Sequence, residues 1–147
     1  MKDDYLFRIR NIEHYYGDYV RVLFLGAAVL SVVAIPLFGD LLPFGTFAQV
    51  GCALLLVLLA GLTNPHSRML MAYDVVVSGL GVFLLESAAI SFYAADTAQL
   101  FAAREVAALA LLFAFYFSIK TLRAMMLGKV GKMERPWEFE DGKDKPE

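Results

Sequence analysis

Four long apolar segments take up most of the 147-residue chain and constrain its fold more than any other feature. Each segment is long enough, at about 1.5 Å of helix per residue, to cross a hydrocarbon layer about 30 Å thick. Hydrophobic residues make up 59% of the chain, whereas soluble domains contain roughly 45–50%. We therefore expect an all-α membrane protein with no room for a separate globular domain.

Turn residues divide the apolar sequence into four transmembrane helices, which we expect to form two antiparallel hairpins. The expected spans cover residues 20–38, 44–62, 68–93 and 98–127. Ser67 and Thr97 stand where the third and fourth helices should begin, and their hydroxyl groups are suited to capping a helix N-terminus. Gly128 is the expected stop of the fourth helix, because glycine commonly follows the last helical turn.

The two ends of the chain differ in composition from the 19–127 transmembrane domain. Residues 1–18 combine charges with apolar residues at helical spacing, which predicts a short amphipathic helix at the membrane surface. A gating arm or a partner-docking helix is the alternative interpretation of this segment. Residues 128–147 are mostly charged and contain Gly and Pro, so we expect a flexible tail.

The basic residues predict the orientation of the protein in the membrane. With four spans, twelve of the 13 Lys and Arg residues fall on one side, and only Arg104 lies near the other. Basic residues concentrate on the cytoplasmic side of membrane proteins. We therefore expect a multi-pass protein of the plasma (inner) membrane with both termini in the cytoplasm.

Glu86 and Arg104 are the first candidate pair of intramembrane charges. If the second hairpin turns near Ala95, Glu86 precedes the turn by nine residues and Arg104 follows it by nine. An isolated charge in hydrocarbon costs several kcal/mol, so a partner at the same depth is expected. The pair is interpreted as a staple that sets the register of two helices, or as the lining of a water-filled path.

Asp74 is a second and separate candidate site, closer to the cytoplasmic side. It shares one helical face with Ser78 and Gly81. Lys120 or Arg21 could reach Asp74 by extending along the membrane interface. The alternatives are a pairing role for Asp74 and a polar vestibule that could hold a solute or contact a partner.

Glu105 is a third candidate position, on a face of the fourth helix that it shares with Leu109, Leu112 and Tyr116. A ridge of small residues lies on a different face of this helix, with Arg104 on its flank. The ridge falls in a narrow band that would allow another helix to approach closely, and it consists of Ala103, Ala107, Ala110 and Ala114. Glu105 points away from this band, so we expect it at the headgroup level near the start of the fourth helix, where the helix dipole favours an acid. The alternative is a contact with another subunit.

Catalytic and metal chemistry find little support in the sequence. Asp74 and Glu86 are separated by about 18 Å along one helix, too far to act on one reacting atom. Cys52 is the only cysteine, and His14 and His66 stand apart, so no thiol cluster or His/Cys metal site is expected. Phosphate-binding loops, zinc-protease motifs and nucleophile elbows are absent. We expect no enzyme, no cofactor and no nucleic-acid partner.

These observations favour a non-enzymatic membrane protein that works by assembly. The first hypothesis is a homo-oligomeric channel or transport protein, in which the face of Asp74 and Ser78 lines the seam between subunits. The alternative is an accessory or scaffold subunit that docks on another membrane protein, with its charges setting helix register. The expected partners are the lipid bilayer and either further copies of the chain or another membrane protein.

Overall fold

The computed structural model describes residues 15–63 and 67–128, and in these residues all regular structure is helical. The four helices are α2 (Gly17–Leu37), α3 (Thr46–Leu62), α4 (Arg68–Ser91) and α5 (Ala98–Met126). The predicted interfacial helix and the predicted charged tail fall almost entirely outside the described residues.

Three of the helices, α2, α4 and α5, are long and apolar enough to cross a membrane. The fourth, α3, is equally apolar but has only 17 residues, or about 26 Å of helix. It begins at Thr46 rather than at the expected residue 44, because Gly45 holds a positive φ of 85°. That backbone conformation is open to glycine and ends the loop abruptly.

Both predicted helix caps are confirmed, as is the predicted stop. The Ser67 hydroxyl accepts a hydrogen bond from the Leu70 amide at 3.4 Å, and the Thr97 hydroxyl accepts one from Leu100 at 3.3 Å. After α5, Gly128 takes a φ of 64°. Each device satisfies backbone groups that a helix end leaves without intrahelical partners.

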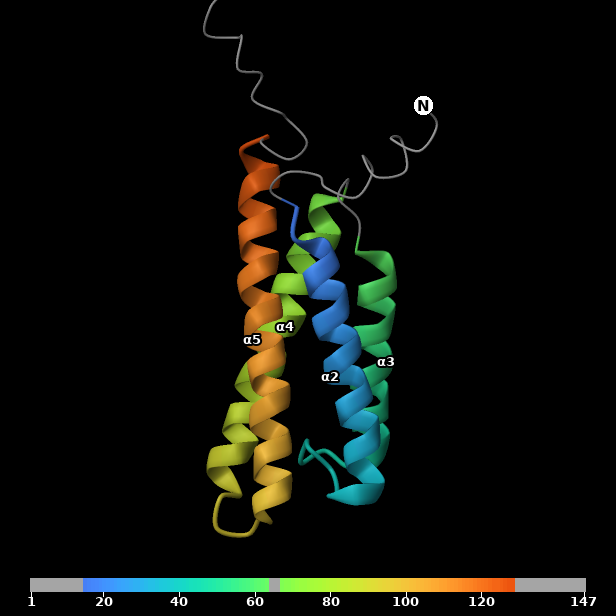
Figure 1. Cartoon of the computed structure of the whole chain (residues 1–147), viewed down its shortest axis with the longest axis vertical. Helices are drawn as coiled ribbons and strands as arrows, with labels where there is room; N and C mark the ends of the chain where they lie inside the picture. Colours follow the sequence, from blue (N-terminus) through green and yellow to red (C-terminus); the bar gives the residue numbers. More distant parts are fainter. Residues whose placement is uncertain (1–14, 64–66, 129–147) are drawn as a thin grey trace, which may run out of the picture.

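The helices run alongside one another, and the α2–α3 and α4–α5 loops lie at the same end (Figure 1). We call this the lower end; it holds the loops 38–45 and 92–97. The upper end is where α2 and α4 begin and where α3 and α5 finish. Helix α2 packs against α3 and α5, and α5 packs against α4, whereas α3 and α4 touch at few points. The bundle is therefore less closed between α3 and α4 than elsewhere.

Small side chains form much of the interior, where α5 meets its neighbours. Ala103, Ala107 and Ala114 of the predicted ridge are buried, and α2 contributes Ala27 and Ala28. Alanine lets helix backbones approach closely where hydrocarbon surrounds the protein. The outward faces carry large apolar residues, such as those of α3, as a lipid-facing surface requires.

Gly45 provides a test of the loop geometry. Its φ of 85° and ψ of 164° fall in a region that side chains avoid at a cost of about 1–3 kcal/mol. Gly45→Ala should therefore lower the free energy of unfolding by about that amount. Gly51→Ala is the matched control, because Gly51 lies within α3 with open space around its Cα. There alanine should stabilise by up to about 1 kcal/mol. Reversible denaturation in mixed micelles measures the free energy of unfolding of both variants. If Gly45→Ala were as stable as Gly51→Ala, the positive φ of Gly45 would not be required by the loop.

Candidate functional site

Asp74 lies on the buried face of α4, with 0% of its surface exposed. Met71 and Ser78, one turn to either side, lie on the same face, as their spacing along a helix requires. Both Asp74 and Ser78 are thus enclosed within the four-helix unit rather than exposed on its outer surface.

The Asp74 carboxyl group has few hydrogen-bond partners for a group that is fully buried. Thr63, just after α3, has its hydroxyl 3.1 Å from Asp74 Oδ2 and 2.7 Å from the Leu59 carbonyl oxygen. A hydroxyl has one hydrogen to donate, so it serves only one of these two acceptors at a time. Asp74 Oδ1 has no hydrogen-bond partner among the described residues. The Ser78 hydroxyl donates to the backbone oxygen of Asp74 at 2.5 Å and not to the carboxyl group.

Arg21, one of the two predicted partners of Asp74, reaches it only indirectly. Its guanidinium donates to the Thr63 carbonyl oxygen and forms an ion pair with Asp18 at 3.4 Å. Its Nε is buried without a partner in the described part of the chain. Lys120, the other candidate, extends instead over the Tyr16 ring, with Nζ 4.3 Å from the ring centroid. Thr63 is therefore the link between Arg21 and Asp74.

Two further polar side chains at the upper end lack partners. The Tyr15 hydroxyl is buried and unpaired among the described residues. Burial raises the pKa of Tyr15; the positive charge of Arg21 opposes this effect, and the negative charges of Asp18 and Asp74 add to it. The second is Ser118 of α5, whose hydroxyl is likewise buried and unpaired.

The packing of α4 on α5 places Ser118 at the level of Asp74. A Cβ on Gly79 would lie 3.1 Å from the Phe115 ring, so residues 79 and 115 face each other. Because α4 and α5 run in opposite directions, a step of three residues toward the upper end leads from 115 to 118 on α5 and from 79 to 76 on α4. Ser118 is therefore at the level of position 76, between Asp74 and Ser78. We call Tyr15, Arg21, Thr63, Asp74 and Ser118 the Asp74 cluster. It combines four elements of the fold and four buried polar atoms without hydrogen-bond partners among the described residues.

Arg104 forms a second polar centre, at the lower end, and its guanidinium is well satisfied. Nε donates to the Leu41 carbonyl oxygen at 2.8 Å, Nη2 to that of Asp40 at 3.3 Å, and Nη1 to that of Ala88 at 3.5 Å. Nη1 also forms an ion pair with Asp96, in which both side chains are nearly buried. One side chain on α5 thus joins both loops of the lower end to α4.

The predicted Glu86–Arg104 pair is replaced by a different pair in the structure. Arg104 meets Asp96, and Glu86 has no ion pair within residues 15–63 and 67–128. The contact with Ala88 shows that Arg104 lies two residues nearer the turn than the expected level. Glu86 also follows the buried Leu85 directly, and the step of about 100° per residue turns it away from the interior.

Gln49 is an important residue that sequence reasoning missed. It is only 1% exposed, and its Oε1 accepts from the amides of Leu41 at 2.6 Å and Leu42 at 3.2 Å. Its Nε2 donates to the Ser31 carbonyl oxygen at 2.7 Å. The available signal was a single amide side chain in an otherwise apolar span, where a polar group requires partners within the protein.

Glu105 is half-buried on α5, beside Arg104, and has no ion pair in the described part of the chain. Leu109 and Leu112, which were expected to share its face, are largely exposed. This position agrees with an outward-directed residue near the start of α5. It does not contribute to either polar centre.

An apolar cleft of about 200 Å³ lies where α3 and α4 separate. Leu55 and Leu56 line it from α3, and Val77, Leu80 and Leu84 line it from α4. Val77 is one turn from Asp74, so the cleft extends from near the Asp74 cluster toward the lower end. Its lining is suited to hydrocarbon and not to a solvated ion.

Within the described residues, no group of three or more His, Cys, Asp or Glu side chains is placed to share a metal ion. Comparisons with protein families, curated proteins and solved structures return no match to the chain. The interpretation of the two polar centres therefore depends on their geometry.

The Arg104 centre generates a prediction that separates its two candidate partners. Arg104→Gln should lower the free energy of unfolding by about 3–5 kcal/mol, because it leaves a nearly buried carboxylate unpaired. Asp96→Asn should be costly as well, and the double variant should cost less than the sum of the two. Glu86→Gln is the control and should cost below about 0.5 kcal/mol. Steric-trapping measurements in bicelles give the free energy of unfolding of each variant. If Glu86 were the partner, Glu86→Gln would cost more than Asp96→Asn.

Gln49 provides a second prediction about the lower end. Gln49→Leu removes the acceptor of two loop amides and should destabilise the protein by about 1–3 kcal/mol. Gln99→Leu is the matched control, since Gln99 is exposed at the start of α5. Amide hydrogen exchange at Leu41 and Leu42 should rise in the first variant alone. Unchanged exchange there would show that Gln49 does not hold the loop.

Proposed function

We propose that this protein is a non-enzymatic, homo-oligomeric transport protein of the plasma (inner) membrane, in which the Asp74 cluster binds a proton or a small cation. The observation that carries the proposal is the fully buried Asp74 carboxyl group, whose Oδ1 has no partner among the described residues. Ionisable residues within a membrane are costly and mark ion paths more often than they serve packing alone.

The contrast between the two polar centres supports a functional role for Asp74. Arg104 is surrounded by three carbonyl oxygens and a carboxylate, which is the arrangement expected of a structural clamp. Asp74 has one hydroxyl partner shared with a carbonyl oxygen. A group that held the fold together would be fully satisfied. An incompletely satisfied one is suited to exchanging a proton or an ion.

The proposed orientation has two antiparallel hairpins and places the upper end in the cytoplasm. Arg21, Arg68, Lys120 and Arg123 lie toward that end, whereas Arg104 lies toward the other. This distribution follows the preference of basic residues for the cytoplasmic side. The Asp74 cluster would then bind its ligand from the cytoplasm.

A single four-helix bundle of this size leaves little interior room for a solute path, which supports assembly as part of the mechanism. Asp74 and Ser78 are buried within the subunit, so they do not line a seam between subunits as first expected. Beyond Val77 the Asp74 cluster borders the cleft between α3 and α4, whose lining is apolar. A polar path from the cluster would therefore need side chains from another subunit.

A second candidate function is an accessory subunit of another membrane protein. The observation that favours it is the same cleft, where α3 and α4 scarcely contact each other. A transmembrane helix of a partner could fill this side of the bundle. The buried charges would then serve only the register of the helices.

Transport by purified protein tests the first proposal. Proteoliposomes should show an influx of protons or of Na⁺ or K⁺ that follows an imposed membrane potential, read with a pH-sensitive or cation-sensitive dye. Asp74→Asn should reduce the rate at least about tenfold, because an intramembrane ionisable group is lost. Glu86→Gln is the matched control on the same helix and should leave the rate unchanged.

Two results would contradict the transport proposal. Equal rates for the wild type and Asp74→Asn would assign Asp74 to structure. A detergent-corrected mass of one 16.3 kDa chain by light scattering would exclude the homo-oligomer. Absence of flux together with a single-chain mass would favour the accessory subunit.

A further inference from the structure

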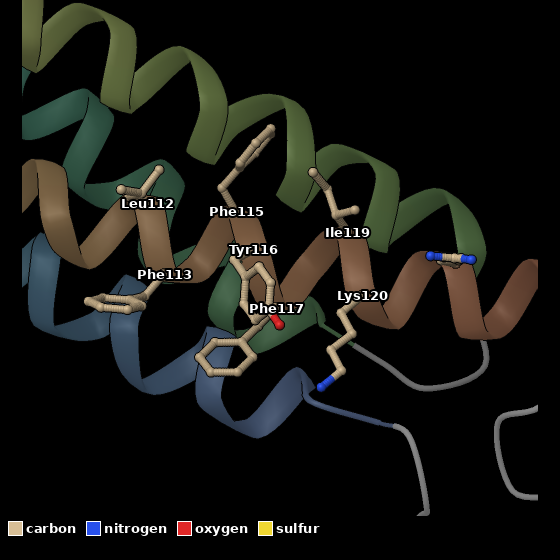
Figure 2. A pocket seen from close by; sticks show the side chains of 8 residues that line it. Leu112, Phe113, Phe115, Tyr116, Phe117, Ile119 and Lys120 are labelled. Carbon is tan, nitrogen blue, oxygen red and sulfur yellow. The ribbon is translucent and has the colours of Figure 1, made fainter.

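The outer face of α5 carries an open groove of about 720 Å³ near the upper end (Figure 2). Its lining is apolar and aromatic over most of its length and basic at one end. The lining residues are Leu112, Phe113, Phe115, Tyr116, Phe117, Ile119, Lys120 and Arg123. The groove is separate from the Asp74 cluster, which lies inside the bundle.

The aromatic walls of the groove are held by neighbouring helices. Phe115 points toward α4, where its ring lies against Gly79. Phe117 points toward α2 and stacks on Tyr16 and Tyr19, with ring centroids 5.7 and 5.4 Å apart. Tyr116 lies between these two directions and is 56% exposed. Two anchored rings therefore enclose a surface that the chain itself leaves uncovered in its described part.

The basic end of the groove consists of two cations, of which Lys120 is oriented by an aromatic ring, and neither has an acidic partner in the described residues. Lys120 Nζ lies 4.3 Å from the Tyr16 ring centroid, a cation–π contact that orients the side chain without neutralising its charge. Arg123 is exposed one turn further toward the end of α5. Neither residue forms an ion pair within residues 15–63 and 67–128.

We propose that this groove binds a phospholipid with a net negative headgroup. One acyl chain lies along the apolar part between Phe115 and Phe117, and the phosphate group meets Lys120 and Arg123. The charge complementarity is the argument for the occupant, because two uncompensated cations lie where a membrane-spanning helix reaches the headgroups. Arg binds phosphate through two parallel hydrogen bonds, and Lys acts as a point charge.

The proposal does not depend on transport. In the orientation proposed above, the groove faces the cytoplasmic leaflet, where anionic lipids are concentrated. A hydrocarbon chain without a charged headgroup would satisfy the aromatic walls but would leave both cations without a counter-ion. The chemistry of the whole groove therefore specifies an anionic lipid and not a zwitterionic one.

Native mass spectrometry of the full chain in neutral detergent tests the proposal, with dioleoyl phosphatidylglycerol and dioleoyl phosphatidylcholine as probes. The wild type should retain phosphatidylglycerol at least about tenfold more strongly, given two basic contacts. Lys120→Gln with Arg123→Gln should remove most of this preference. The charge-conserving pair Lys120→Arg with Arg123→Lys should keep it. Leu112→Trp, which adds bulk within the groove, should weaken retention of both lipids.

Arg68→Gln is the matched control, because Arg68 is an exposed arginine at the same end of the bundle but outside the groove. It should retain the wild-type preference. Equal retention of both lipids by the wild type would overturn the proposal in favour of a neutral lipid. An equal loss in Arg68→Gln would also overturn it, since attraction would then be diffuse. A third result would also overturn the proposal: a wild-type dimer that binds no lipid, and that dissociates and binds lipid in Leu112→Trp. The groove would then be occupied by a second copy of the chain. Thermal melting without lipid verifies that each variant is folded.

Discussion

The absence of water as a hydrogen-bond partner inside a membrane is the constraint on which this structure depends. Every polar group at that depth must find its partner within the protein, and Arg104 shows the result most clearly. From α5 it binds the carbonyl oxygens of Asp40 and Leu41 and that of Ala88, and it pairs with Asp96. Gln49 holds the amide of Leu41 from the other side. The lower end is thereby closed by side chains that satisfy backbone groups of two loops.

The upper end is built on the same four helices but meets this constraint less completely. Asp74 has a shared hydroxyl as its partner, and Tyr15, Arg21 and Ser118 each keep a buried atom without one among the described residues. The protein is thus well satisfied at one end and incompletely satisfied at the other. This difference between the two ends is the basis on which we propose a structural role for the Arg104 centre and a binding role for the Asp74 cluster.

Packing explains why the bundle is open on one side. Small residues allow α2, α4 and α5 to approach closely, and α5 contacts both of the others. Helix α3 follows α2 and is joined to α4 near Thr63 and Asp74, but a cleft separates the two helices further along. Aromatic residues instead cover α5 on its outer face, with Phe117 bridging to the start of α2. The two sides of the bundle therefore present different surfaces to the membrane.

The sequence by itself determined the helices of the described region, the N-caps of α4 and α5, the membrane-compatible character of three of the helices and the small-residue face of α5. These features depend on hydrophobic length, on helical periodicity and on local turn chemistry, and all three can be counted along the chain. Only the tertiary structure decided the partners of the buried polar groups. Asp96 replaced Glu86 as the partner of Arg104 for two reasons. Arg104 lies at the level of Ala88, two residues nearer the turn than Glu86. Glu86 is also rotated by about 100° from the buried Leu85, which turns it away from the interior. Gln49 binds the amides of a loop in which Gly39 and Gly45 take positive φ angles of 103° and 85°, and Asp74 meets Thr63 instead of a basic residue. Pairing of this kind depends on the distance between elements, which is a property of their packing and not of their order in the chain.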